Sequence, residues 1–122
     1  MPTTLVINEP ISTPVAFYRG VDILWPFAYQ DSAGVAVSMA GGTLDCKWYV
    51  DGTEVVNSSA VAIKFTTAWI SQVGGTFRLT LARSINTKAS SEIPNVMDWE
   101  LGFTDASNFR RVLWQSKLTV RP

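Results

Sequence analysis

Two carboxylates on one expected strand have the spacing best suited to acid–base chemistry in this sequence. Asp98 and Glu100 stand two positions apart in a stretch that alternates apolar and polar residues, so a strand would place their Cα atoms roughly 6.5–7 Å apart on one face. Carboxylate pairs carry out acid–base work in glycoside hydrolases, and a glycosidase or lyase is therefore the one enzymatic hypothesis. We favour the alternative that both residues lie on the solvated outer face of a sheet.

Other catalytic groups are scarce. The sequence has no His and a single Cys, Cys46, which excludes Ser-His-Asp and Cys-His mechanisms and removes the commonest metal ligand. Cys46 occupies an apolar position of an alternating stretch, so we expect a buried hydrophobe rather than a nucleophile. We therefore predict a protein that is not an enzyme and that holds no metal and no cofactor, although turns meeting at one end of a sandwich could still bind a cation.

Basic and aromatic residues come together between Phe109 and Trp114, the residue types that stack on bases and neutralise phosphates. Strand alternation would send Arg111 and Trp114 to opposite faces, so they would not form one platform. Ten basic residues are also balanced by ten acidic ones, which leaves no bulk field to attract nucleic acid. We expect no nucleic-acid binding.

Composition indicates one compact, soluble domain made in a reducing cytoplasm. The 122 residues are 47% apolar and 16% charged, which is typical of a chain with a packed core. Cys46 has no partner for an internal disulfide. The longest apolar run, Ile23 to Tyr29, contains Pro26 and is seven residues long, whereas a membrane helix needs roughly twenty. We expect no membrane contact.

A two-residue rhythm of apolar side chains predicts strands along most of the chain. Thr43 to Val50 alternates strictly and leads into Asp51-Gly52, a dipeptide that suits a tight hairpin turn. Further candidates are Val21 to Gln30, Phe77 to Ala82, Met97 to Thr104 and Arg111 to Val120, with weaker ones at Thr4 to Asn8 and Ala60 to Phe65. Roughly seven short strands predict an all-β fold, a two-sheet antiparallel Ig-like β-sandwich.

Several segments depart from this rhythm. Pro26 cannot donate to a ladder, so its strand is expected to lie at an edge or to contain a bulge there. Thr67 to Val73 is predicted to hold a short turn of helix, and Ser84 to Asn95 to form a polar loop. Met1 to Pro14 contains three Pro and is interpreted as an extended N-terminal arm outside the core. The predicted division is an arm over residues 1–16 and a sandwich domain over 17–122.

Parts of the sequence are similar to a known family. Arg19-Gly20-Val21-Asp22-Ile23, followed by the turn Asp31-Ser32-Ala33-Gly34 and the segment to Gly41, resembles the N-terminal domains of bacteriophage baseplate upper proteins. Asp98 to Leu101 and Arg111 to Val120 look like the paired closing strands of that family. Gln115-Ser116 stands where the family has a kink with Gly, and family members continue into further domains where this sequence stops.

The resemblance implies a structural component of a phage virion, made in the host cytoplasm and located in the virion. As a tail or baseplate adaptor, the chain would have other virion proteins and copies of itself as partners. It would dock them through its arm, its exposed aromatics and its sheet edges, partly by strand addition. The alternatives are a capsid decoration protein and a carbohydrate-binding β-sandwich module.

The tryptophans suggest where partners bind. Five Trp exceed what a core of this size needs, and Trp and Arg are enriched at protein interfaces. Trp48 and Trp99 stand mid-strand and are expected in the core. The predicted partner-interface residues are Trp25, Trp69, Arg110, Arg111 and Trp114. In the carbohydrate alternative Trp25 or Trp69 would stack on a sugar ring, and a further possibility is that all five Trp are buried.

Overall fold

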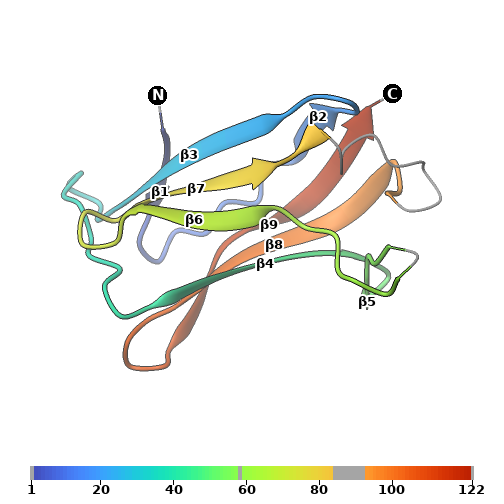
Figure 1. The fold of residues 1–122 in the computed structure, drawn as a ribbon. Helices are drawn as coiled ribbons and strands as arrows, with labels where there is room; N and C mark the ends of the chain where they lie inside the picture. The colour runs from blue at the N-terminus through green and yellow to red at the C-terminus, as the bar shows by residue number, and fades with distance from the viewer. Residues whose placement is uncertain (1, 58, 84–92, 122) are drawn as a thin grey trace.

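Two β-sheets face each other across an aromatic core (Figure 1). The computed structural model describes residues 2–57, 59–83 and 93–121. One sheet has four strands in the order β1-β3-β7-β6, and the other has five in the order β2-β9-β8-β4-β5. The strands are β1 Thr3–Val6, β2 Val15–Tyr18, β3 Ile23–Gln30, β4 Thr43–Val50, β5 Thr53–Glu54, β6 Thr66–Ser71, β7 Thr76–Leu81, β8 Val96–Thr104 and β9 Arg110–Arg121. The predicted all-β sandwich is confirmed.

Both sheets are mixed, so the prediction of wholly antiparallel sheets is wrong. β1 runs parallel to β3, with Thr3 opposite Phe27, and β2 runs parallel to β9, with Val15 opposite Leu118. The other strand pairs are antiparallel. β1 and β2 each lie at the edge of a sheet. Between them the N-terminal segment turns at Asn8 (φ 63°) and passes from one sheet to the other. Alternation identifies strands but does not specify their partners.

The predicted N-terminal arm is also wrong over its described residues. Leu5 of β1 is 1% exposed and belongs to the core. Further along, Ile11 N–H donates to the Leu113 carbonyl at 3.0 Å, and the Trp114 Nε1–H donates to the Thr13 carbonyl at 2.9 Å. The segment closes one side of both sheets, since its apolar residues and its backbone find partners there.

Strand pairing explains two of the segments that depart from the alternation. Pro26 has a partner only in β7, because the register of β1 begins at Phe27, so β3 is locally an edge at Pro26 as expected. The helical turn predicted in Thr67 to Val73 is wrong. Most of that range lies in β6, where a bulge at Trp69 to Ser71 interrupts the alternation that would have revealed a strand. Ser84 to Asn95 lies mostly outside the described residues.

The Asp51-Gly52 turn is confirmed as a two-residue hairpin. Val50 pairs with Thr53 across it, and Asp51 and Gly52 have φ of 49° and 80°, as a type I′ turn requires. The weak candidate Ala60 to Phe65 forms no strand; its one pairing is a bridge from Ala62 to Val56.

One loop conformation occurs three times, at residues 31–35, 57–61 and 105–109. In each loop the first side chain accepts hydrogen bonds from the backbone N–H groups two and four residues later, at 2.9 and 3.0 Å. The fourth residue has positive φ in all three: 83° at Gly34, 60° at Ala60 and 66° at Asn108. Asp31 and Asp105 thus cap the backbone of their own turns, as Asp commonly does.

Candidate docking surfaces

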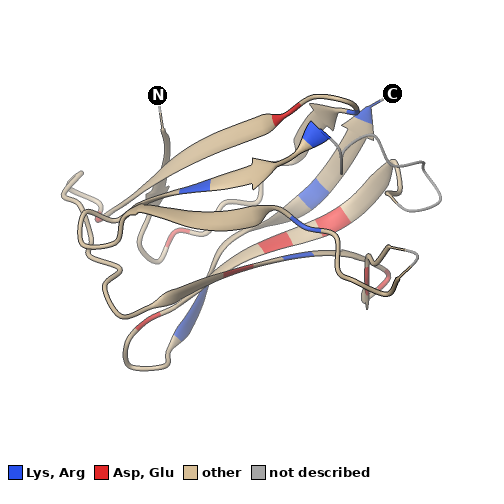
Figure 2. Ribbon diagram, viewed as in Figure 1, with Lys and Arg blue, Asp and Glu red and all other residues tan. Residues whose placement is uncertain are grey.

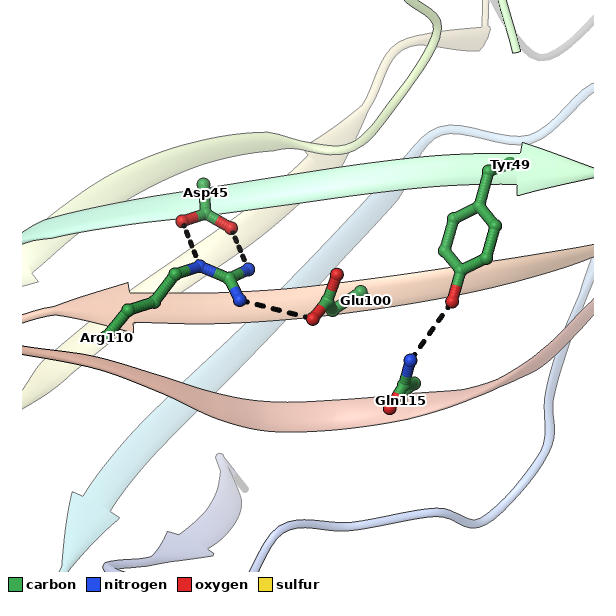
Figure 3. A network of polar contacts seen from close by, with 5 residues as sticks. All are labelled: Asp45, Tyr49, Glu100, Arg110 and Gln115. Carbon is green, nitrogen blue, oxygen red and sulfur yellow. Dashed lines mark hydrogen bonds and ion pairs between the residues drawn. The ribbon is translucent and has the colours of Figure 1, made fainter. Parts of the chain in front are cut away.

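The outer face of the five-stranded sheet carries a network of polar side chains (Figure 3). Arg110 on β9 reaches across β8 to Asp45 on β4, with Nη2–Oδ1 at 2.6 Å and Nε–Oδ2 at 3.1 Å, and its Nη1 lies 3.2 Å from Glu100 Oε1. Two parallel N–H···O bonds to one carboxylate fix the guanidinium plane. The hydrogen bond to Asp45 also raises the pKa of Arg110. Beside this network, Gln115 Nε2 donates to the Tyr49 hydroxyl at 3.1 Å.

Gly102 leaves the space in which the Arg110 side chain crosses β8. A Cβ at this position would lie 2.3 Å from Arg110 Nη2 and 2.7 Å from Asp45 Oδ1. Gly102 pairs with Asp45 on one side, so the guanidinium passes directly over the glycine. A side chain there would have to displace the guanidinium, which joins three strands of the sheet.

Asp98 and Glu100 share this outer face, as the sequence predicted, but each forms an ion pair with a different basic side chain. Glu100 contacts Arg110, and Asp98 Oδ1 lies 2.9 Å from Lys117 Nζ. The hydrogen bond from Lys117 to Asp98 raises the pKa of Lys117. The arrangement is a charge-paired, solvated sheet face, which agrees with the interpretation preferred from the sequence.

Arg111 lies on the opposite face from Arg110. Its Nη1 is 3.0 Å from Asp105 Oδ2, and its guanidinium stands 4.7 Å from the Phe109 ring centroid. Hydrogen bonds lower the pKa of Asp105, first from the Phe109 N–H and then from Arg111. Arg111 thus fixes the loop between β8 and β9, whereas Arg110 crosses the outer face.

Trp114 is buried, so the prediction that it lies on the surface is wrong. A bulge in the β8–β9 pairing gives β9 one extra residue, because Leu101 pairs with Trp114 but Gly102 pairs with Val112. Leu113 and Trp114 are consequently both buried, at 5% and 7% exposed. Strict alternation would have exposed one of them.

Trp25 and Trp69 are both half-buried. The Trp25 ring packs 4.6 Å from Phe27 and 5.2 Å from Trp114, and its Nε1–H donates to Thr3 Oγ1 at 2.8 Å. Trp69 packs edge-on against Phe77. Trp48 and Trp99 are fully buried, as predicted. The five Trp therefore contribute mainly to the core, and each surface candidate among them presents only part of its ring.

The outer face of the four-stranded sheet is nearly free of charge (Figure 2). Four cross-strand rows contribute to this face: Thr66, Thr80 and Leu24; Ala68, Arg78 and Pro26; Ser71, Thr76, Ala28 and Thr4; and Gln30 with Val6. Arg78 is the one charged residue in these rows, and Leu24 is 67% exposed. Ile70 adds an exposed apolar side chain at the end of β6. We call this surface the neutral face; no pattern within a single strand predicts it.

Two of the hollows in the described surface lie between strands of different sheets. A groove of about 440 Å³ follows the outer edge of β4 and is bordered by Leu44 to Cys46 and by residues 61–67. The second hollow, of about 240 Å³, lies between β2 and β3 and is lined by Val15, Ala16, Phe17, Ile23, Trp25 and Phe65. Cys46 is buried at the groove, as predicted, and burial raises the pKa of its thiol to about 12.

Within the described ranges no three His, Cys, Asp or Glu residues cluster as metal ligands would. Among the same residues no helix is long and apolar enough to cross a bilayer. No protein-family model matches this sequence, and no curated protein matches it.

Proposed function

We propose that this chain is a structural component of a phage virion, a tail or baseplate adaptor built on an Ig-like sandwich. In this role it docks other virion proteins and copies of itself and catalyses no reaction. The resemblance of its turn and strand pattern to baseplate upper-protein domains supports the proposal. A four-stranded sheet packed on a five-stranded one is compatible with Ig-like architecture.

The neutral face is the observation that carries this proposal. Its four rows combine small, β-branched, apolar and uncharged polar residues around the single charge of Arg78, and Leu24 and Ile70 project into solvent. Depletion of charge distinguishes the centre of a protein interface from the remaining surface, so a nearly uncharged sheet face is suited to contact with a partner.

The opposite outer face is different in kind. Asp45, Glu100 and Arg110 are bonded to one another there, and Asp98 is bonded to Lys117. Internally paired charges on a solvated face need no partner. The contrast between the two outer faces supports a one-sided contact through the neutral face. The carbohydrate-binding alternative gains less support, because Trp25 and Trp69 pack against core rings.

The proposal is tested with particles purified from cells that produce the chain together with its virion. We expect mass spectrometry to find the chain in the particles at a fixed copy number. Ile70→Asp is expected to reduce incorporation at least tenfold. The matched control is Val96→Asp, because Val96 is equally exposed (55%) on the other outer face. Absence of the wild-type chain from purified particles would overturn the proposal.

A further inference from the structure

The strand β4 has an open backbone edge over most of its length. β8 pairs with β4 from Thr43 to Tyr49, whereas β5 pairs only with Tyr49 and Val50. The Trp48 carbonyl accepts a hydrogen bond from Val55 N–H at 2.8 Å, so the backbone groups of Trp48 point away from β8. Alternate residues of a strand point the same way. The N–H and C=O groups of Leu44 and Cys46 therefore also point away from β8, and they have no backbone partner among the described residues.

These open backbone groups border the groove beside β4. Its walls and floor include Cys46, Ile63 and Phe65, which are all buried, and on the far side lie Thr66 and Thr67 of β6. β6 is itself the outermost strand of its sheet. The groove thus lies between the free edges of the two sheets and offers hydrogen-bonding groups above an apolar floor.

The charge available at the groove is positive. Lys64 lies on its border and forms no ion pair with a described residue. Asp45 also borders the groove, but its two carboxylate oxygens are bonded to Arg110 on the outer face. An acidic side chain beside Lys64 would therefore find an attractive partner and no uncompensated like charge.

We propose that the groove accepts an extended acidic segment of a neighbouring polypeptide, which adds as a strand to β4. The segment bonds to the backbone of Leu44 and Cys46, places apolar side chains on the groove floor and brings a carboxylate to Lys64. Strand addition of this kind takes its affinity from main-chain hydrogen bonds and its specificity from alternate side chains. This inference rests on the proposed function, since it specifies the chemistry of one virion partner.

A second copy of this chain is a less suitable occupant. A two-fold pairing of β4 with β4 would bring two Lys64 side chains to one seam, and like charges across a strand pair are destabilising. The occupant is therefore a different, acidic segment.

The first measurement is amide hydrogen exchange of the isolated full chain by NMR. In the free protein, the amides of Leu44 and Cys46 are expected to exchange at least tenfold faster than those of Asp45 and Lys47, which face β8. Equal protection of all four would show that the edge is closed and would overturn the inference.

The second measurement adds an acetylated octapeptide, Thr-Val-Glu-Val-Thr-Val-Glu-Thr, as the probe. Saturation is expected to slow exchange at Leu44 and Cys46 at least tenfold. A peptide N-methylated on every residue, which removes the N–H donors of both edges, is expected to have no such effect. Equal binding of both peptides, no binding, or binding without protection of Leu44 and Cys46 would overturn the inference, as would protection that depends only on the concentration of the chain.

Charge variants test the role of Lys64. Lys64→Glu is expected to weaken binding of the acidic peptide by about two- to fivefold, the upper part of the range of an exposed ion pair. Lys47→Glu is the matched control, because Lys47 is exposed on the outer face of β4 and does not border the groove. The affinity of this variant for the peptide should remain at the wild-type value. Equal loss in both variants would contradict the local role of Lys64. If the chain binds the peptide but is absent from particles, the proposed function is overturned and strand addition at β4 stands. If the chain is incorporated into particles but does not bind the peptide, strand addition at β4 is overturned and the proposed function stands.

Discussion

The three equivalent loops permit a reciprocal test of backbone strain. Position four has positive φ in each loop and is Gly34 in the first and Ala60 in the second. A Cβ in the left-handed region costs about 1–2 kcal/mol. Gly34→Ala is expected to destabilise the protein, and Ala60→Gly to stabilise it, because the two substitutions exchange the same residue types in the same conformation.

The structure limits the magnitude. A Cβ at Gly34 would meet no atom within 4 Å, so the substitution adds only the conformational cost. Replacing Gly by Ala also restricts the unfolded chain, which returns about 0.4–1 kcal/mol. The net expectation is a loss of about 1 kcal/mol for Gly34→Ala and a gain of about the same size for Ala60→Gly.

Urea denaturation monitored by Trp fluorescence measures both free energies of unfolding. The control is Asn108→Gly in the third loop, where φ is 66°. Asn tolerates left-handed backbone, so its gain is expected to be smaller than that of Ala60→Gly. Changes of the same sign at Gly34 and Ala60 would refute the reasoning, because left-handed strain requires opposite signs.

Three further predictions concern the core, the outer face and the thiol. Leu5→Ala is expected to lower the free energy of unfolding, measured by urea denaturation, by about 2–5 kcal/mol, because Leu5 is 1% exposed. The control Thr4→Ala, on the neutral face, should change it by less than about 0.5 kcal/mol. Equal effects of the two substitutions would contradict the placement of β1. Gly102→Ala is expected to displace the Arg110 guanidinium at a cost below about 1 kcal/mol, seen as a shift of the Arg110 Nε–H NMR signal, and an unchanged signal would contradict the crossing geometry. Cys46 is expected to resist iodoacetamide at pH 8 until the chain is unfolded. Burial raises the pKa of its thiol from 9.0 to about 12 and favours the neutral form, so its contribution to stability is complete below pH 9 and is lost as the pH rises toward 12; Cys46→Ala should flatten that part of the stability profile.

Local sequence determined the elements whose signals are complete within a few residues. Thr43 to Val50 and Met97 to Thr104 alternate strictly because each strand has one face in the core. Asp51-Gly52 specifies its turn through the positive φ of both residues. The same local logic identified the burial of Cys46, which occupies an apolar position of an alternating strand.

Features without a local sequence signal, and contacts between residues far apart in the chain, were decided only by the tertiary structure. The loop that begins at Asn57 has neither the Asp at the first position nor the Gly or Asn at the fourth that its two equivalents have. Its hydrogen bonds and the positive φ of Ala60 identify it. The bulge that buries Trp114 depends on how β9 pairs with β8. Arg110 and Asp45 are 65 residues apart, and Gly102 allows them to meet.

The two outer faces show the same division. Alternation determined which residues of each strand face outward, because successive side chains of a strand point to opposite sides. The neutral face exists because β6, β7, β3 and β1 are neighbours, and the groove exists because β5 leaves Leu44 and Cys46 uncovered. Strand order is a property of the assembled sheets, since it depends on contacts between segments that are far apart in the chain.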